Sequence, residues 1–140
     1  MDSSASSRSA PPDPTREAVA NKIAHDVVGA DPAIMSLIVL DHRGSTRVIA
    51  VARSANLPSD SRASPALVER FGIAATVVWG AAEGAAQLMG RREFIIGAFK
   101  DQLVLLVGLR EYEMLLAMRL NRSANAEHVY AKVANLLGLS

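Results

Sequence analysis

The sequence contains no cysteine and few aromatic residues. The absence of cysteine excludes disulfide bonds, thiolate metal sites and a cysteine nucleophile from these 140 residues. Phe, Trp and Tyr together make up only 4% of the chain, whereas half of all residues are apolar. Ala, Val, Leu and Ile must therefore form most of the core, and the length fits one domain.

The chain also lacks an excess of charge and a long uncharged segment. Its 15 basic and 14 acidic residues give a net charge of +1, which provides no electrostatic surface for nucleic acid or acidic lipid. Arg70 and Glu83 enclose only twelve uncharged residues, 71–82. A membrane-spanning helix needs about 20 predominantly apolar residues. We therefore expect no nucleic-acid binding, no membrane insertion and a cytoplasmic location.

The first residues, "MDSSASSRSAPPDP", are rich in serine and proline and contain no apolar run that could form the core of a signal peptide. Such a composition buries too little surface to offset the entropy of ordering. We expect a disordered tail over residues 1–12 and a folded domain over residues 13–140.

The usual signals of catalysis and cofactor binding are missing. Neither GxxxxGK[ST] nor GxGxxG occurs, so the chain is not expected to bind a nucleotide itself. The three histidines, His25, His42 and His128, fall on separate predicted elements without ligand spacing. The carboxylates form no recognisable catalytic pair. We expect a protein that is not an enzyme and that has no cofactor, metal or catalytic residue.

The apolar patterns predict helices and strands in the order α-β-β-α-β-β-β-α. Asp13-Pro14 and Ser64-Pro65 each combine a capping residue with proline at the first helical position. Five short apolar runs with tight connectors indicate antiparallel strands. The predicted elements are a helix from 14 to 28, strands at 33–40 and 47–53, a long helix at 66–89, strands at 92–99, 102–109 and 113–120, and a last helix capped around Asn121–Ser123. This order predicts a three-layer α+β domain in which one long helix covers one face of a five-stranded antiparallel sheet and two helices cover the other.

The same order, with three local stretches, resembles the roadblock / dynein light chain family, including its prokaryotic members. The stretches are "LIVLDHRGSTRVIA", "REFIIGAFKDQLVLLVGLREYEMLLAMRL" and "NRSANAEHVYAKVANLLG". The resemblance covers roughly residues 13–139 and rests on the order of the elements. Profilin-like and longin-like domains have a related architecture. A longin would normally begin with strands, and the few aromatic residues argue against a profilin poly-proline site.

The resemblance implies a homodimer in which the third strand of each copy pairs edge to edge and the long helices lie side by side. Such dimers serve as platforms for small Ras-like GTPases or as scaffold subunits. Some members stimulate GTP hydrolysis without a catalytic residue of their own. We therefore expect a non-enzymatic homodimeric module that binds or regulates a small GTPase. The alternatives are a scaffold subunit without GTPase coupling and a profilin- or longin-like domain that senses a small molecule.

The long helix carries two apolar stripes, although a helix on the surface of a monomer needs only one. The stripe predicted to cover the sheet contains Leu67, Phe71, Ala75, Val78, Ala82 and Met89. The second stripe is predicted to contact the second copy, since its small residues allow two backbones to approach closely. Its members are Ile73, Val77, Gly80, Ala81, Gly84 and Leu88.

The predicted homodimer implies two further groups of contact residues. Phe94, Ile95 and Ile96 lie on the third strand and are predicted to take part in self-pairing, which would remove an exposed sheet edge. Partner contact is a hypothesis for Trp79, Glu83, Arg91 and Arg92. For Trp79 a half-buried structural role is an equal alternative, and cations beside a helix C-terminus are favourable in themselves.

Overall fold

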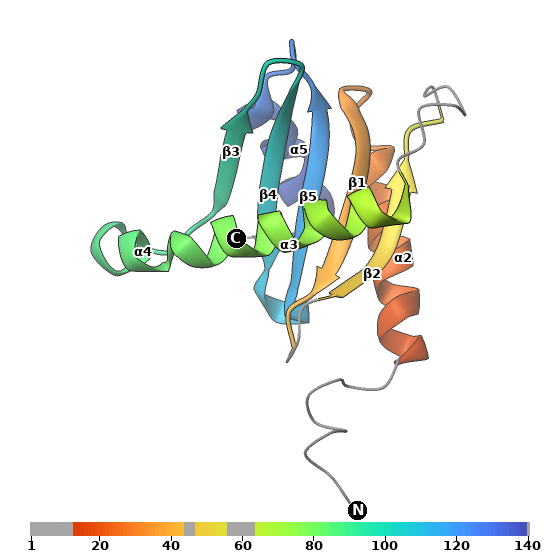
Figure 1. Cartoon of the computed structure of the whole chain (residues 1–140), viewed down its shortest axis with the longest axis horizontal. Helices are drawn as coiled ribbons and strands as arrows, with labels where there is room; N and C mark the ends of the chain where they lie inside the picture. The colour runs from red at the N-terminus through yellow and green to blue at the C-terminus, as the bar shows by residue number, and fades with distance from the viewer. Residues whose placement is uncertain (1–12, 44–46, 56–63, 140) are drawn as a thin grey trace, which may run out of the picture.

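The structure, a computed structural model, describes residues 13–43, 47–55 and 64–139 (Figure 1). The expected disordered tail, residues 1–12, lies outside the described residues. The helices and strands are α2 (Pro14–Val28), β1 (Ile34–Asp41), β2 (Arg47–Arg53), α3 (Pro65–Ala81), α4 (Glu83–Met89), β3 (Phe94–Ala98), β4 (Gln102–Leu109), the 3-10 turn η2 (Arg110–Tyr112), β5 (Met114–Asn121) and α5 (Ala126–Leu137).

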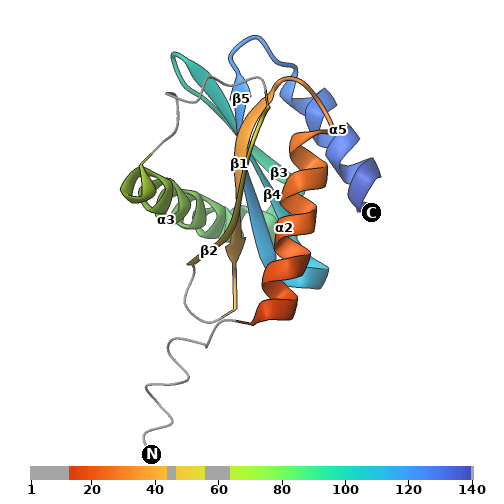
Figure 2. The ribbon, with the colours of Figure 1, turned by 90° about the vertical axis from the view of Figure 1, so that its right-hand side faces the viewer.

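The five strands form one antiparallel sheet in the order β2-β1-β5-β4-β3. Figure 2 shows α2 and α5 on one face of this sheet and α3 on the other. The predicted three-layer α+β architecture is therefore confirmed. The strand that was expected to pair with a second copy, β3, lies at one edge of the sheet, and β2 lies at the other edge.

Side-chain caps fix the starts of three helices. Oxygens of Asp13, Ser64 and Asn125 accept backbone N–H groups from the first turns of α2, α3 and α5 at 3.0 to 3.2 Å. The first two caps were predicted from their cap-plus-proline pattern. The third cap was wrongly predicted at Asn121–Ser123, because Asn121 still belongs to β5 and a turn follows it.

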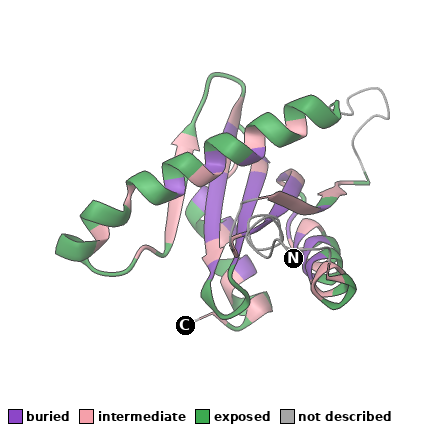
Figure 3. Cartoon of the chain, turned by 60° about the horizontal axis from the view of Figure 1, so that its bottom comes forward, coloured by how far each residue is buried: buried purple, intermediate pink, exposed green. Residues whose placement is uncertain are grey.

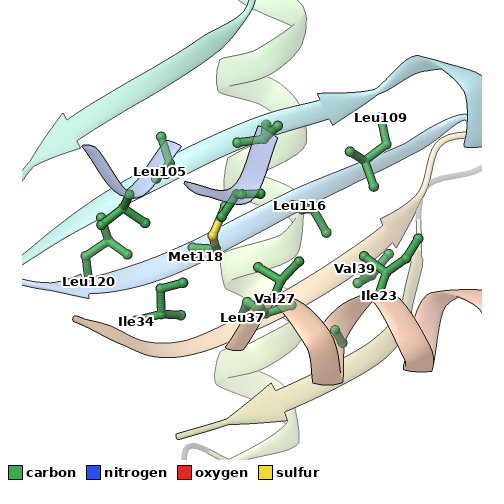
Figure 4. Packing of buried hydrophobic residues seen from close by; sticks show 14 of the residues in the cluster. Ile23, Val27, Ile34, Leu37, Val39, Leu105, Leu109, Leu116, Met118 and Leu120 are labelled. Carbon is green, nitrogen blue, oxygen red and sulfur yellow. The ribbon is translucent and has the colours of Figure 1, made fainter. Parts of the chain in front are cut away.

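The main core lies between the sheet and the helices α2 and α5 (Figure 4). It draws Ile23 and Val27 from α2, Leu37 and Val39 from β1, Leu105 and Leu109 from β4, Leu116 and Met118 from β5, and Val129 and Val133 from α5. On β4, Leu106 points to the opposite face and packs in a smaller cluster under α3. Side chains on both faces of β4 take part in packing, which explains why its apolar run lacks alternation.

The long helix predicted over residues 66–89 is interrupted, and the structure has two helices, α3 and α4, that meet at Ala82. The prediction of one unbroken helix is wrong here for a physical reason. Gly80 and Gly84 flank the break, and each glycine costs about 1 kcal/mol relative to alanine inside a helix. No residue of α4 is buried, so packing within the chain does not compensate.

Candidate interaction surface

The inner side of α3 contacts the sheet through Gly72, Ala75 and Trp79, the three residues of this helix that are buried. A Cβ added to Gly72 would lie 2.9 Å from a side-chain carbon of Leu40 on β1. A Cβ added to Gly108 on β4 would lie 2.5 Å from the Trp79 ring. The two glycines therefore provide the space in which the helix and its tryptophan approach the sheet.

This placement corrects the stripe that was predicted to cover the sheet. Ala75 of that stripe is buried and Phe71 packs against the cluster under α3, but Leu67, Val78 and Met89 are 54%, 47% and 85% exposed. Periodicity indicates that an apolar stripe exists without fixing how the helix is rotated about its axis. The slot over Gly108 accepts Trp79, and this contact sets the rotation.

The outer sides of α3 and α4 are exposed (Figure 3), and large apolar side chains are prominent among their exposed residues. Six of the eleven exposed large hydrophobic residues found in the described chain lie there, so the exposure is concentrated on these two helices. We call these six the apolar helix surface: Leu67, Ile73, Val77, Val78, Leu88 and Met89. All six residues of the second stripe predicted from the sequence, Ile73, Val77, Gly80, Ala81, Gly84 and Leu88, are exposed. Such a concentration of exposed large apolar side chains on two neighbouring helices is typical of an interaction site.

Three of the four residues considered for partner contact lie together at the junction of α3 and α4. The Arg92 guanidinium stacks 4.7 Å from the centre of the Trp79 ring. Arg92 also donates hydrogen bonds to the Trp79 carbonyl oxygen and, at 3.0 Å, to Glu83 Oε1. In a continuous helix this carbonyl would instead accept the backbone N–H of Glu83, four residues later in the chain. Trp79 is only 6% exposed in the single chain, which favours the alternative of a structural role, and partner contact stays a prediction. Glu83 and Arg91 are exposed.

The edge strand β3 pairs only with β4 among the described residues. The Phe94 ring stacks on Tyr130 of α5 with 4.3 Å between ring centres, and Ile95 packs in the cluster under α3. Ile96 is 39% exposed. Since two of the three predicted side chains pack within the chain, the edge offers a second copy mainly its backbone N–H and C=O groups.

The helix α3 covers only part of its face of the sheet, and an open groove with a volume of about 1190 Å³ lies beside it. Apolar side chains from β1, β2, β4 and α3 line much of this groove, together with Phe99. On its floor, Arg119 of β5 donates from Nε to Gln102 Oε1 at 2.9 Å and from Nη1 to Ser36 Oγ at 3.2 Å. The sequence analysis missed this network. Its signal was that Ser36 and Arg119 interrupt two otherwise apolar runs.

A second polar cluster joins α2 to the end of β1. Asp41 is 3% exposed and bonds Arg16 of α2 at 2.9 Å and the side chain of Arg43 at 3.4 Å. Burial by itself would raise the pKa of Asp41, but the hydrogen bonds from Arg16 and Arg43 outweigh it and lower the pKa to about 2. Burial and the nearby charge of Arg92 lower the pKa of His42. Because its carboxylate is fully engaged within the chain, this cluster acts as a structural anchor.

Within residues 13–43, 47–55 and 64–139, no group of three or more His, Asp or Glu side chains could hold a metal ion. No helix found among these residues is both long enough and apolar enough to cross a membrane.

The sequence and the fold of the chain were compared with those of known proteins. No protein-family model and no curated protein sequence matches the chain. Solved structures do match. A roadblock/LC7 domain from Streptomyces avermitilis is 17% identical with a TM-score of 0.59, and the match covers 84% of this chain and 91% of that chain. An MglB structure described as having a tetrameric arrangement is 16% identical with a TM-score of 0.60, and the match covers 92% of both chains.

A third match is the gliding protein MglB from Thermus thermophilus. It is 14% identical with a TM-score of 0.52, and the match covers 90% of this chain and 91% of that chain. At these identities the likeness concerns the fold, which extends over nearly the whole of each chain. The chain therefore has the fold of a roadblock domain, as the order of its elements predicted.

Proposed function

We propose that this chain is a non-enzymatic, homodimeric interaction module that binds or regulates a small Ras-like GTPase in the cytoplasm. The observation that carries the proposal is the apolar helix surface, whose α4 end extends beyond β3, a strand that pairs on one side only among the described residues. Monomeric proteins rarely expose so many large apolar side chains on one surface, and an open sheet edge is an aggregation hazard.

A single two-fold axis accounts for both features. Placed beside β3 and perpendicular to the sheet, the axis would pair β3 antiparallel with its copy and join the two sheets. The helices α3 and α4 of both copies would then lie on the same face of the joined sheet and approach each other across the axis. Gly80 and Gly84 have open space around them in the single chain, which leaves room for a closely packed neighbouring helix.

The GTPase part of the proposal rests on the fold. Roadblock domains, which the sequence resembles, are dimeric platforms for small Ras-like GTPases, and one matched structure is described as having a tetrameric arrangement. The sequence lacks a phosphate-binding motif of its own, so the nucleotide would be held by the partner. In this proposal the chain acts by binding and by shaping the GTPase.

The dimer is tested with Gly80→Leu. A side chain at this position meets nothing within 4 Å in the single chain, so the fold is expected to tolerate it. In a close helix contact the leucine would separate the two copies. We expect the unaltered chain to have the mass of a dimer by light scattering and Gly80→Leu to have the mass of a monomer or to aggregate. Ala131→Leu, which adds an exposed leucine on α5, serves as the control and is expected to remain dimeric. A monomeric unaltered chain contradicts the proposal.

The GTPase is tested by co-elution of the dimer with purified Ras-like GTPases from the same cell, loaded with GDP or with a GTP analogue that is not hydrolysed. Binding that depends on the nucleotide supports regulation, and equal binding in both states supports a platform. A dimer that binds none of them in either state contradicts the GTPase proposal and favours the scaffold subunit.

A further inference from the structure

The groove beside α3 carries an excess of positive charge. Three arginines line it, Arg47, Arg53 and Arg119, whereas Glu69 is the acidic residue found along it in the described chain. In the sheet register, Ser36 of β1 lies between Arg53 of β2 and Arg119 of β5. We call these three residues the arginine row. Adjacent strands are about 4.8 Å apart, so the backbones of its two arginines are about 10 Å apart. This row therefore favours an anion.

Arg119 is a half-buried charge to which the described chain supplies no opposite charge. Its Nε donates to Gln102 Oε1 at 2.9 Å and its Nη1 to Ser36 Oγ at 3.2 Å, and both acceptors are neutral. The salt bridges found among the described residues all join other side chains. A charge that is partly removed from water is costly unless a partner compensates it. The two hydrogen bonds hold the guanidinium in place, and the N–H groups of Nη2 remain as donors for an acceptor.

The neighbouring row of the sheet, nearer to α3, is entirely apolar. It runs across the five strands through Val51, Ile38, Ala117, Leu106 and Ile95, and we call it the apolar row. Side chains alternate along a strand, so residues two positions apart, such as Ile38 and Ser36, share one face. The helix α3 crosses the strands on this face (Figure 1). Beside it, Val51 and Ile73 line the groove and are 49% and 58% exposed. The groove thus changes from positively charged to apolar within one residue row.

This polarity limits the class of molecule that fits. A small inorganic anion would pair with Arg119 and leave the apolar row uncovered, and a purely apolar molecule would leave Arg119 without an opposite charge. Ligand sites usually have volumes of about 300–1,000 Å³ and combine apolar walls with a few placed polar groups. The groove, at about 1190 Å³, has the size and the lining of such a site. A carboxylate matches the planar donors of a guanidinium.

We propose that the groove binds a small amphiphilic anion, a free fatty carboxylate, whose head group pairs with Arg119 and whose chain lies along the apolar row beside α3. The site belongs to one chain, because β5 is the central strand and β4 and β3 lie between it and the edge proposed to pair with a second copy. The inference goes beyond the proposed function and depends neither on the homodimer nor on a GTPase.

The test is calorimetric titration of the full chain with decanoate, which has the carboxylate and the chain. Decanol has the same chain without charge, and acetate has the carboxylate without the chain. We expect decanoate to bind about tenfold more tightly than decanol, the worth of one hydrogen bond from a charged group. Acetate is expected to show no binding at the same concentrations, since it buries almost no apolar surface.

The role of Arg119 is tested by its effect on the difference between the two probes. Arg119→Met keeps an unbranched side chain and removes the charge, so it should weaken the binding of decanoate about tenfold and leave that of decanol unchanged. Arg119→Lys should recover part of the loss. The control is Arg122→Met, which removes one charge from the exposed turn after β5, outside the groove, and should leave both affinities unchanged. If Arg119→Met weakens both probes equally, Arg119 does not bind the head group.

The position of the chain is tested with Val51→Glu, which places a charge in the apolar row. Val51 is exposed on an edge strand, so the fold should tolerate this change, and decanoate and decanol should both bind about tenfold more weakly. Leu136→Glu is the matched control, since Leu136 is 48% exposed on α5 at the other face of the sheet. It should leave both affinities unchanged. Circular dichroism shows whether each variant is folded, and Val51→Glu decides the outcome if Arg119→Met is not.

Nuclear magnetic resonance then locates the probe. Decanoate should shift the side-chain amide signals of Gln102 and the backbone amide signals of Ser36 and Ile38. Absence of decanoate binding, equal affinities for decanoate and decanol, or shifts confined to the apolar helix surface would each overturn the inference. None of these results bears on the mass of the protein or on its binding of a GTPase, so the proposed function is tested separately.

Discussion

The two faces of the sheet differ in how completely the chain covers them. On the face of α2 and α5 the core is closed, and Leu105, Leu116 and Val133 have no exposed surface. On the other face α3 covers a smaller cluster around Trp79, next to an open groove and the apolar helix surface.

The two faces therefore contribute to different properties, one to the stability of the single chain and the other to association. Burial of apolar surface on the first face stabilises the single chain, because its side chains meet others of the same chain. The side chains of the apolar helix surface are exposed in the single chain and become buried only when something else covers them. Stability should therefore respond most to substitutions in the core of the first face, and association to substitutions in the apolar helix surface.

The largest expected effect is the loss of a core side chain from the closed face. Leu116→Ala should lower the free energy of unfolding by about 2–5 kcal/mol, since it removes buried methyl groups and leaves a cavity. Urea denaturation at several protein concentrations measures this. Leu88→Ala is the matched change on the open face and should leave the unfolding of the monomer nearly unchanged while weakening dimerisation. Equal losses of monomer stability would refute the division between the faces.

Gly108→Ala tests the contact on which the rotation of α3 depends. The added methyl group would meet the Trp79 ring, which is buried and has little room to move. Overpacking of this kind typically costs about 1–3 kcal/mol, and the environment of the ring should change. Denaturation followed by tryptophan fluorescence reports both effects, since Trp79 is the only tryptophan of the chain. Unchanged fluorescence and stability would show that the ring does not lie over this strand.

The anchor at Asp41 predicts a dependence of stability on pH. Its folded pKa of about 2 is lower than the ordinary value of 3.8, so the ionised form stabilises the folded state. This contribution, about 2 kcal/mol, should be fully present above pH 4 and lost as the pH falls toward 2. Asp41→Asn should remove that part of the acid dependence, as measured by chemical denaturation between pH 2 and 7. If both proteins lose stability in parallel, the dependence belongs to other carboxylates.

The smallest expected effect compares two glycines of the same helix. Gly80→Ala should raise the stability of the monomer by up to about 1 kcal/mol, because alanine favours a helix and the site is open. Gly72→Ala gains the same helix propensity, but its Cβ would meet Leu40 at 2.9 Å, so it should gain less or lose stability. Thermal unfolding at low protein concentration measures both variants. A larger gain for Gly72→Ala would contradict the close approach of α3 to β1.

Much of the fold could be predicted because its signals are local. Asp13-Pro14 and Ser64-Pro65 start their helices through contacts within one turn, and tight connectors between apolar runs lead to antiparallel pairing. The second apolar stripe, which includes Ile73 and Val77, is exposed in the single chain. Its role as a dimer interface remains a prediction.

Other features could not be predicted, because they depend on residues distant in sequence. The side of α3 that meets the sheet is set by Gly108, which lies 29 positions after Trp79. The break at Ala82 is accompanied by the contacts of Arg92 with Trp79 and Glu83. The groove forms where β1, β4 and β5 bring Ser36, Gln102 and Arg119 together, and no local pattern places these three residues side by side.

The sequence by itself determined the order of the helices and strands, their arrangement on both faces of one antiparallel sheet, and the excess of apolar side chains on the helix before β3. Periodicity and capping are properties of neighbouring residues, so they can be read without the fold. Only the tertiary structure decided that Trp79 faces the sheet, that α4 lies beyond the β3 edge, and that a groove containing Arg119 remains open. These features arise from packing between distant segments, where the shape of one strand determines which side of a helix can approach it.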